Sequence, residues 1–532
     1  MAHRLGRLAG LCSFALAVGL IAGCSRWSAA VSRKCEETVS MRKIQLSRSD
    51  YYDKMFACWL GKNIGGTLGA PFEGRKQVNN LTFFTPVPSG PAANDDLDFQ
   101  IVWLKMLEDK KTEPTLSDFA EYWHKYLLAY PWNEYGFCQR NLERGLMPPI
   151  SGCFENYFVD EMRSPIRSEI WACIAPGDPQ LAAALAWTDS ALDHAGGEGT
   201  YGEMFWAAVE SAAFVEKDPE TLIRIGLAMI PVPCAISRVI REAVWCSENG
   251  VPWADARERI ATIFGHHQPC NAIPNHGFII LGWLYGTEFG DKLCKAVNCG
   301  FDTDCTGATL GSLLGIIGGT PGIPDAWRKP VGEDIVLHKY TGAFNSPKTV
   351  KELTDRVQVV AEKFVPRYSD VAEFADRTSL PDDLLSSLFR NDKAIEMLRK
   401  DVQSAIVNSG GYEITFHYNG EPVLRPNIQR TFAVSIEKQG HPLDAQVAVK
   451  VPQGWTVSTC QQGTGHHNIT VLASQVPDRN TITITAQLPD GNRSFDFTIL
   501  GPGEAKGFPS GANVPTCPKC GARVSACMCV PP

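Results

Sequence analysis

Glycines at helical spacing constrain the fold of this chain more than any other sequence feature. A glycine recurs at every fourth position in residues 61–69, and the same spacing returns in residues 307–315. Glycines four residues apart share one face of a helix. Because each glycine inside a helix costs about 1 kcal/mol relative to alanine, two such runs indicate a packing requirement. We therefore expect two central helices of an α-helical bundle that approach closely, rather than a membrane dimer motif.

An acidic cluster lies near each glycine run. Residues 94–96 (Asn-Asp-Asp) follow the first run and residues 302–304 (Asp-Thr-Asp) precede the second, and a helix-like segment follows each cluster. Carboxylates gathered in one pocket raise one another's pKa unless cations hold them ionised. Carboxylate, hydroxyl and amide oxygens are the ligands that Mg²⁺, Mn²⁺ and Ca²⁺ prefer. The two clusters therefore predict one shared divalent-metal site.

Helix capping is the alternative interpretation of these clusters. Acidic residues before a helix are common N-caps, and the positive end of the helix dipole favours them. A single cluster would most often be such a cap. Two clusters that each accompany a glycine-rich helix favour the metal site instead.

The same segments resemble a known family. Residues 61–73, 94–96 and 296–311 resemble the ADP-ribosylglycohydrolase family, which includes the dinitrogenase-reductase-activating glycohydrolases. Four further segments resemble motifs of that family in the same order. Residues 164–169 resemble its Met-Arg motif, residues 175–186 a helix, residues 193–194 its Thr-His motif and residues 199–202 its glycine-tyrosine motif. The resemblance covers roughly residues 50 to 330. It implies an all-α catalytic domain that binds two Mg²⁺ or Mn²⁺ ions and hydrolyses the bond joining ADP-ribose to a modified side chain.

The resemblance also implies roles for individual residues. The metal ligands would be Asn94, Asp95, Asp96, Asp302, Asp304 and the residue at the position of Cys305. Glu73 matches the glutamate that works beside the metals, and either Glu73 or Asp96 is expected to act as the catalytic base, with Asp98 as a further candidate. His194 and Tyr201 fall where the family lines the phosphates and ribose of its substrate.

Two positions depart from the family pattern. Asn94 replaces a threonine, although its amide oxygen can still bind a hard cation. Cys305 replaces the threonine of the second cluster, and a thiol is a poor partner for Mg²⁺. The choice between one and two metal ions, and the identity of the second ion, therefore stays open.

The first residues predict export and a lipid anchor. Residues 1–23 contain two arginines, then a short apolar run and then small residues before the expected cleavage site. This order is typical of a secretory signal peptide. Residues 21–24 (Ile-Ala-Gly-Cys) resemble a bacterial lipobox, which implies diacylation of Cys24. Ser25 favours the outer membrane under the sorting rule of some Gram-negative bacteria. Residues 24–48 are expected to form a tether, and the protein is expected to be membrane-anchored.

The length and charge agree with an exported enzyme of several domains. The chain has 532 residues, a formal net charge of −8 and 44% hydrophobic residues. A net negative charge does not indicate the basic surface that binds nucleic acid, so no nucleic-acid partner is expected. We expect the helical catalytic domain to cover residues 49–400.

Beyond residue 400 the period of the apolar residues changes from helical to alternating. Six alternating segments lie at residues 412–418, 431–436, 445–451, 468–473, 481–486 and 494–500. Alternation between turn residues predicts a β-sandwich domain at residues 411–500. It could bind sugar or space the enzyme from the membrane, and the lack of an aromatic row favours the spacer.

The remaining residues, 501–532, are expected to form a linker and a cysteine-rich tail. The tail holds Cys517, Cys520, Cys527 and Cys529. Four thiolates resemble a small structural zinc site, but two disulfides compete with it in an exported protein.

Together these patterns predict a metal-dependent hydrolase that cleaves a ribosyl N- or O-glycosidic bond in a small-molecule or protein substrate. Two alternatives stay open. Cys305 is compatible with a surface binding or scaffolding lipoprotein that has lost turnover. Export is compatible with a metal-dependent glycosidase that acts on an extracellular nucleoside or glycan.

Overall fold

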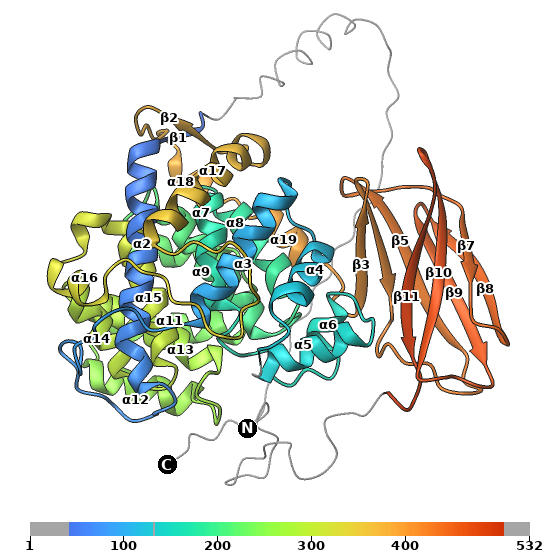
Figure 1. Cartoon of the computed structure of the whole chain (residues 1–532), viewed down its shortest axis with the longest axis horizontal. Coiled ribbons are helices and arrows are strands. Elements are labelled where there is room, and N and C mark those ends of the chain that lie inside the picture. Colours follow the sequence, from blue (N-terminus) through green and yellow to red (C-terminus); the bar gives the residue numbers. More distant parts are fainter. Residues whose placement is uncertain (1–41, 131–132, 505–532) are drawn as a thin grey trace, which may run out of the picture. The chain divides into compact units, whose positions relative to one another are not determined.

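The computed structural model describes residues 42–130 and 133–504 (Figure 1). Helices occupy most of the chain between residues 48 and 398. The longer helices are α2 (Arg48–Gly69), α3 (Asp95–Lys110), α4 (Leu116–Tyr126), α5 (Asn133–Glu143), α8 (Pro179–Ser190), α9 (Glu198–Ala213), α10 (Pro219–Ala228), α11 (Ala235–Glu248), α12 (Trp253–Phe264), α13 (Ala272–Tyr285), α14 (Phe289–Asn298), α15 (Thr303–Gly318) and α17 (Val350–Tyr368). The predicted all-α catalytic region is therefore confirmed.

Short helices and one small strand pair complete this region. They are η1 (Ala70–Phe72), α6 (Ile150–Cys153), η2 (Pro165–Arg167), α7 (Ser168–Ile174), η3 (Thr320–Gly322), α16 (Asp325–Val331), α18 (Leu384–Leu388) and α19 (Asp392–Leu398). Strand β1 (Ile44–Ser47) pairs in parallel with β2 (Ala372–Ala375), which ties the start of α2 to the segment after α17. No helix within residues 42–130 and 133–504 has the length and apolarity that a membrane crossing requires.

Helices α2 and α15 pack against each other along the predicted glycine faces. A Cβ atom placed on Gly61 would overlap the carbonyl oxygen of Gly311, and one on Gly65 would overlap that of Gly307. Only glycine permits backbones to approach so closely. The predicted packing reason for the glycine spacing is confirmed.

The direction of this pairing determines where the ends of the two helices lie. Gly69, the last residue of α2, contacts Thr303, the first residue of α15, and the Thr303 hydroxyl donates to the Gly69 carbonyl oxygen at 2.8 Å. The helices are therefore antiparallel. As a result, Glu73, just beyond α2, is brought close to the aspartates at the start of α15.

The C-terminal region consists of antiparallel sheets, as predicted. Its strands are β3 (Ser404–Ser409), β4 (Tyr412–His417), β5 (Arg430–Lys438), β6 (His441–Pro442), β7 (Val447–Lys450), β8 (Trp455–Gly463), β9 (His466–Ala473), β10 (Arg479–Leu488) and β11 (Gly491–Leu500). One sheet has the order β11-β10-β7, and the other has the order β3-β4-β5-β9-β8, with β6 beside β5. Phe416 of one sheet stacks on Phe497 of the other with ring centroids 4.9 Å apart, so both sheets share one apolar core.

Candidate metal centre

The first acidic cluster starts helix α3. Asn94 is the N-cap residue, and its side-chain oxygen accepts the backbone N–H of Asp96 at 2.9 Å. This bond uses one lone pair of the amide oxygen that was predicted to bind a metal, so a ligand role for Asn94 would use the other. Asp95 and Asp96 occupy the first turn, where the positive end of the helix dipole favours negative charge.

The second acidic cluster starts helix α15. Asp302 is its N-cap residue and Asp304 lies in the first turn. Gly300 and Phe301, just before Asp302, both have positive φ angles, at 76° and 70°. Phe301 rarely adopts such a backbone conformation, so tertiary contacts must hold the turn in place.

Those contacts come from the segment that carries Glu73. The backbone N–H of Gly74 donates to the Phe301 carbonyl oxygen at 2.8 Å, and the Phe301 N–H donates to the Arg75 carbonyl oxygen at 2.7 Å. This two-bond link holds the backbone after Glu73 against the backbone before Asp302. The backbone next to Glu73 is therefore held in place by hydrogen bonds.

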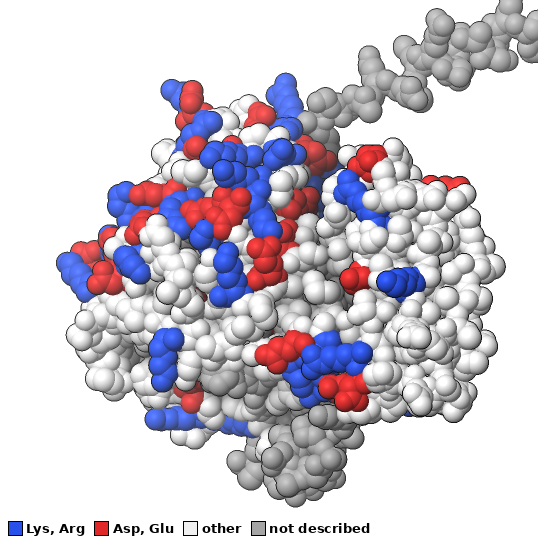
Figure 2. All heavy atoms as spheres, turned by 45° about the vertical axis from the view of Figure 1, so that its right-hand side comes forward, with Lys and Arg blue, Asp and Glu red and all other residues white. Residues whose placement is uncertain are grey.

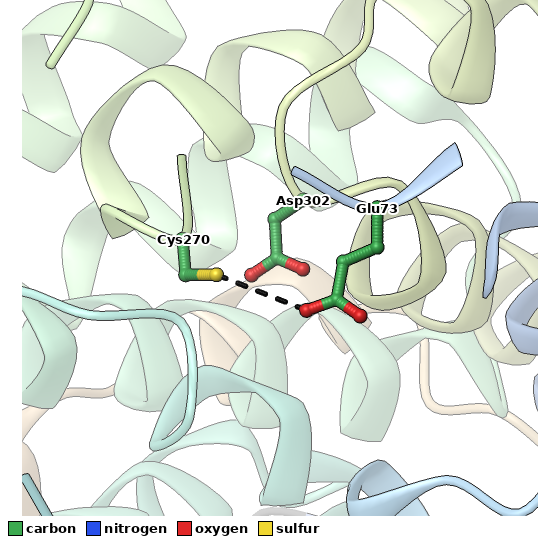
Figure 3. Close-up of side chains that lie close together, drawn as sticks. All are labelled: Glu73, Cys270 and Asp302. Carbon is green, nitrogen blue, oxygen red and sulfur yellow. Dashed lines mark hydrogen bonds between the residues drawn. The ribbon is translucent and has the colours of Figure 1, made fainter. Parts of the chain in front are cut away.

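Two groups of ligand atoms result from this arrangement. Asp96, Asp304 and Cys305 form one group, and within it the three ligand atoms all lie within 4.8 Å of one another. Glu73, Cys270 and Asp302 form the second group, with the same limit (Figure 3). The structure thus brings both acidic clusters and Glu73 together, as the sequence predicted for a shared site.

Several carboxylate oxygens at this site are buried without described N–H or hydroxyl donors, which indicates whether the site fits a cation. Neither oxygen of Asp302 accepts a hydrogen bond from a described N–H or hydroxyl group, although the residue is only 1% exposed. One oxygen of Asp96 and one of Asp304 are in the same situation. A buried carboxylate without donors is costly. Divalent cations bound at the two groups would satisfy these oxygens, so the donor set fits one or two metal ions.

The electrostatics of the site favour the same conclusion. Burial raises the pKa of Asp96, Asp302 and Asp304; repulsion by Asp304 adds to the effect on Asp96 and Asp302, and repulsion by Asp95 adds to the effect on Asp304. Repulsion by Asp304, with partial burial, raises the pKa of Glu73 to about 7. Without a cation the cluster therefore resists full ionisation at neutral pH.

A buried network of Lys62, Gln100 and Glu169 lies next to Asp96. Lys62 donates to Glu169 at 2.7 Å, and both side chains are almost completely buried. Gln100 donates to the other Glu169 oxygen at 2.8 Å and to the Asp96 carbonyl oxygen at 2.7 Å. Lys62 opposes the rise in the pKa of Asp96. This network therefore orients the first turn of α3 and partly balances its charge.

Asp95 interacts with the side chain of Arg163. Its carboxylate lies 3.5 Å from the Arg163 guanidinium and 3.4 Å from the Tyr135 hydroxyl. Arg163 also lowers the pKa of Glu73 through its charge. Arg163 lies directly before residues 164–169, which carry part of the family resemblance.

Asp98 is hydrogen-bonded within the protein. The same carboxylate oxygen accepts from Tyr130, from the Thr341 hydroxyl at 3.2 Å and from the His338 backbone N–H at 3.0 Å. Asp98 belongs to neither ligand group. These bonds tie α3 to residues 338–341 through one oxygen of Asp98, while its other oxygen is buried without a described N–H or hydroxyl donor, so a role as catalytic base stays a prediction.

His194 and Tyr201 do not belong to the two ligand groups. His194 is fully buried, and its ring lies 3.1 Å from the carboxylate of Asp193, which in turn pairs with Arg167 at 2.9 Å. Tyr201 is half-buried in the first turns of α9. Their predicted contacts with the phosphates and ribose of a substrate stay predictions.

Cys270 is the site residue that sequence reasoning missed. It lies in the segment between α12 and α13, which carries no motif of the resemblance. Only the fold brings its thiol to Asp302. The predicted lipidation residue, Cys24, and the tail cysteines Cys517, Cys520, Cys527 and Cys529 lie outside the described residues.

Thermal unfolding of the metal-stripped protein should report the repulsion within this site. Acids with raised pKa values bind protons more tightly in the folded state, so their contribution to stability is lost as the pH rises. For Glu73 the window runs from its ordinary value of 4.5 to about 7. We expect the melting temperature to fall across this window and to recover when Mn²⁺ is added. The Asp302→Asn variant should lose less stability over the same range, and an equal loss in both proteins would contradict the account.

Three comparisons with known proteins identify what this chain is similar to. A family model described as ADP-ribosylglycohydrolase matches residues 47–368. A solved structure titled "ADP-ribosylglycohydrolase-related protein complex" is similar, with a TM-score of 0.41 and 18% sequence identity, over 60% of this chain and 99% of that chain. The search of curated proteins found no match.

Proposed function

Because the chain belongs to the ADP-ribosylglycohydrolase family, we propose that it is a metal-dependent hydrolase that cleaves a ribosyl N- or O-glycosidic bond. The observation that carries this proposal is the convergence of Asp96, Asp304, Asp302 and Glu73 around buried oxygens that lack donors. The cofactor would be one or two divalent ions, Mg²⁺ or Mn²⁺ by the family pattern. When bound, such ions supply positive charge that activates water and orients ribose hydroxyls.

The protein's own residues would supply the catalytic base and the electrostatic stabilisation of the transition state. Glu73 is the residue best suited to accept the proton of the attacking water, since it is the most accessible carboxylate of the two groups. Asp96 is less suited, because it is fully buried and accepts the thiol of Cys305. The clustered carboxylates would stabilise the positive charge that develops on the ribose ring as the bond breaks.

Substrate contacts and location form part of the same proposal. His194 and Tyr201 would line the phosphates and ribose, which for the buried His194 requires a local opening. The substrate would be a ribosylated small molecule or protein.

The signal sequence and Cys24 support export and lipid anchoring, which predicts that a Cys24→Ala variant leaves the membrane fraction. The tail cysteines would hold a structural zinc ion or form disulfides.

Two observations favour other functions. Cys305, in place of a threonine ligand, favours a binding protein without turnover. The export signal favours a glycosidase for an extracellular nucleoside or glycan. Figure 2 shows basic and acidic side chains intermingled on one face, so charge on that face does not single out a class of partner.

A substrate panel separates these functions. The purified protein with Mn²⁺ is incubated with ADP-ribosylated arginine and serine peptides, nucleosides and glycosides, and released ribosyl products are measured by mass spectrometry. We expect cleavage of at least one ribosyl donor, and loss of that cleavage with a chelator. Metal binding without any cleavage would favour the binding protein, and cleavage that persists without metal would contradict the proposal.

A further inference from the structure

Each ligand group contains one cysteine. Cys305 belongs to the group of Asp96 and Asp304, and Cys270 belongs to the group of Glu73 and Asp302. A buried free thiol normally packs as a small apolar side chain. These two thiols instead face carboxylates, which are poor packing partners for an apolar group.

The position of Cys305 is set by helix α15. It lies in the first turn, directly after Asp304, and is 5% exposed. Its Sγ atom lies 3.4 Å from the Asp96 Oδ1 atom, across the junction of α15 and α3. The thiol therefore donates to the Asp96 carboxylate, whose other oxygen lacks a described N–H or hydroxyl donor.

The position of Cys270 is set by hydrogen bonds around its backbone. The Cys270 carbonyl oxygen accepts from Met162 at 2.8 Å. The Asn275 amide donates to the Pro269 carbonyl oxygen at 2.8 Å, and its oxygen accepts the Asp302 backbone N–H at 3.1 Å. Asn275 thus links the cysteine segment directly to the start of α15.

These bonds hold the thiol beside a carboxylate that lacks N–H and hydroxyl donors among the described residues. The Cys270 thiol lies 4.0 Å from a Glu73 oxygen, and the Asp302 carboxylate lies beside both (Figure 3). Asp302 is almost completely buried, and neither of its oxygens has a donor among the described N–H and hydroxyl groups. This carboxylate is the independent sign that a cation belongs between these three side chains.

We propose that Cys270 and Cys305 are thiolate ligands of the metal centre, which would make it select Zn²⁺ and similar ions over Mg²⁺. The inference rests on the proposed function, since it concerns the same centre. On binding, each S–H bond breaks, its proton passes to solvent and a sulfur–metal bond forms. Thiolates favour Zn²⁺ and Co²⁺, whereas Mg²⁺ demands oxygen ligands. Mn²⁺ would bind with intermediate preference.

Cobalt titration tests this proposal without using activity. Thiolate bound to Co²⁺ gives a charge-transfer band in the near ultraviolet, whereas carboxylate ligands do not. The tail could also bind Co²⁺, so the titration uses the metal-stripped full-length chain with Cys517, Cys520, Cys527 and Cys529 replaced by serine. We expect this parent protein to show the band.

Three variants of that parent assign the band. Cys305→Thr and Cys270→Ser should each remove about half of it, and the double variant should remove all of it. Cys246→Ala is the matched control, because Cys246 is a buried thiol on α11 outside both ligand groups. The double variant should also lower the preference for Zn²⁺ over Mg²⁺ by at least about tenfold, measured by competition. Thermal unfolding confirms that each variant is folded.

The outcomes separate this inference from the proposed function. Co²⁺ binding without the band, or a band that survives in the double variant, would overturn the thiolate ligands while Mn²⁺-dependent cleavage could still stand. A cysteine-dependent band in a protein that cleaves no substrate supports the ligands and removes the hydrolase. A protein that binds no divalent ion overturns both.

Discussion

Replacing Asp304 with asparagine is expected to lower hydrolysis by at least about 100-fold and to weaken metal binding by a similar factor. Asp304 offers a candidate ligand atom beside Asp96 and Cys305, and its charge is the largest influence on the pKa of Glu73. Asparagine keeps the shape of the side chain and removes the charge. Substrate turnover and Mn²⁺ calorimetry on the purified variant measure the two effects.

The same variant should be at least as stable as the parent protein when no metal is present. Removing Asp304 relieves the repulsion that raises the pKa of its neighbours, so the metal-free melting temperature should hold or rise at pH 8. Asp325→Asn is the matched control, since Asp325 occupies the first turn of α16 and is exposed. A variant that loses activity only because it unfolds would contradict the assigned role.

Replacing Gly311 with alanine should destabilise the protein by about 3 kcal/mol or more. The added methyl group would overlap the backbone of Gly61, and backbone cannot move aside as a flexible side chain can. Chemical unfolding by urea measures the change.

Gly318→Ala is the control from the same helix. A Cβ atom at Gly318 would meet no neighbour within 4 Å, so alanine should be neutral or slightly stabilising. Equal effects of the two substitutions would show that the glycine face has no packing role.

The central part of the fold could be predicted because its signals are local and periodic. Glycine spacing in residues 61–69 and 307–315 determines which helix faces meet, and the carboxylates next to these runs then converge. Alternation identified the strands that bury one face, such as β9 and β10. Strand β8 was missed because it is exposed on nearly every residue and therefore has no apolar alternation.

The rest of the site depends on contacts between distant segments. Nothing near Cys270 in the sequence indicates a ligand, and only the hydrogen bonds of Asn275 bring that segment to Asp302. Asn94 was predicted as a ligand from its match to the first acidic cluster of the family, and in the structure the same oxygen caps α3. Local chemistry could not decide between these two uses.

A crystal grown with Mn²⁺ and measured for anomalous scattering tests the central claim most directly. We expect an anomalous peak within coordination distance of Asp96 and Asp304, between the first turns of α3 and α15. A second peak beside Asp302 would indicate two ions, and one peak alone is compatible with the account. A map at full Mn²⁺ concentration with no peak near these aspartates would contradict a shared metal centre and, with it, the proposed hydrolysis.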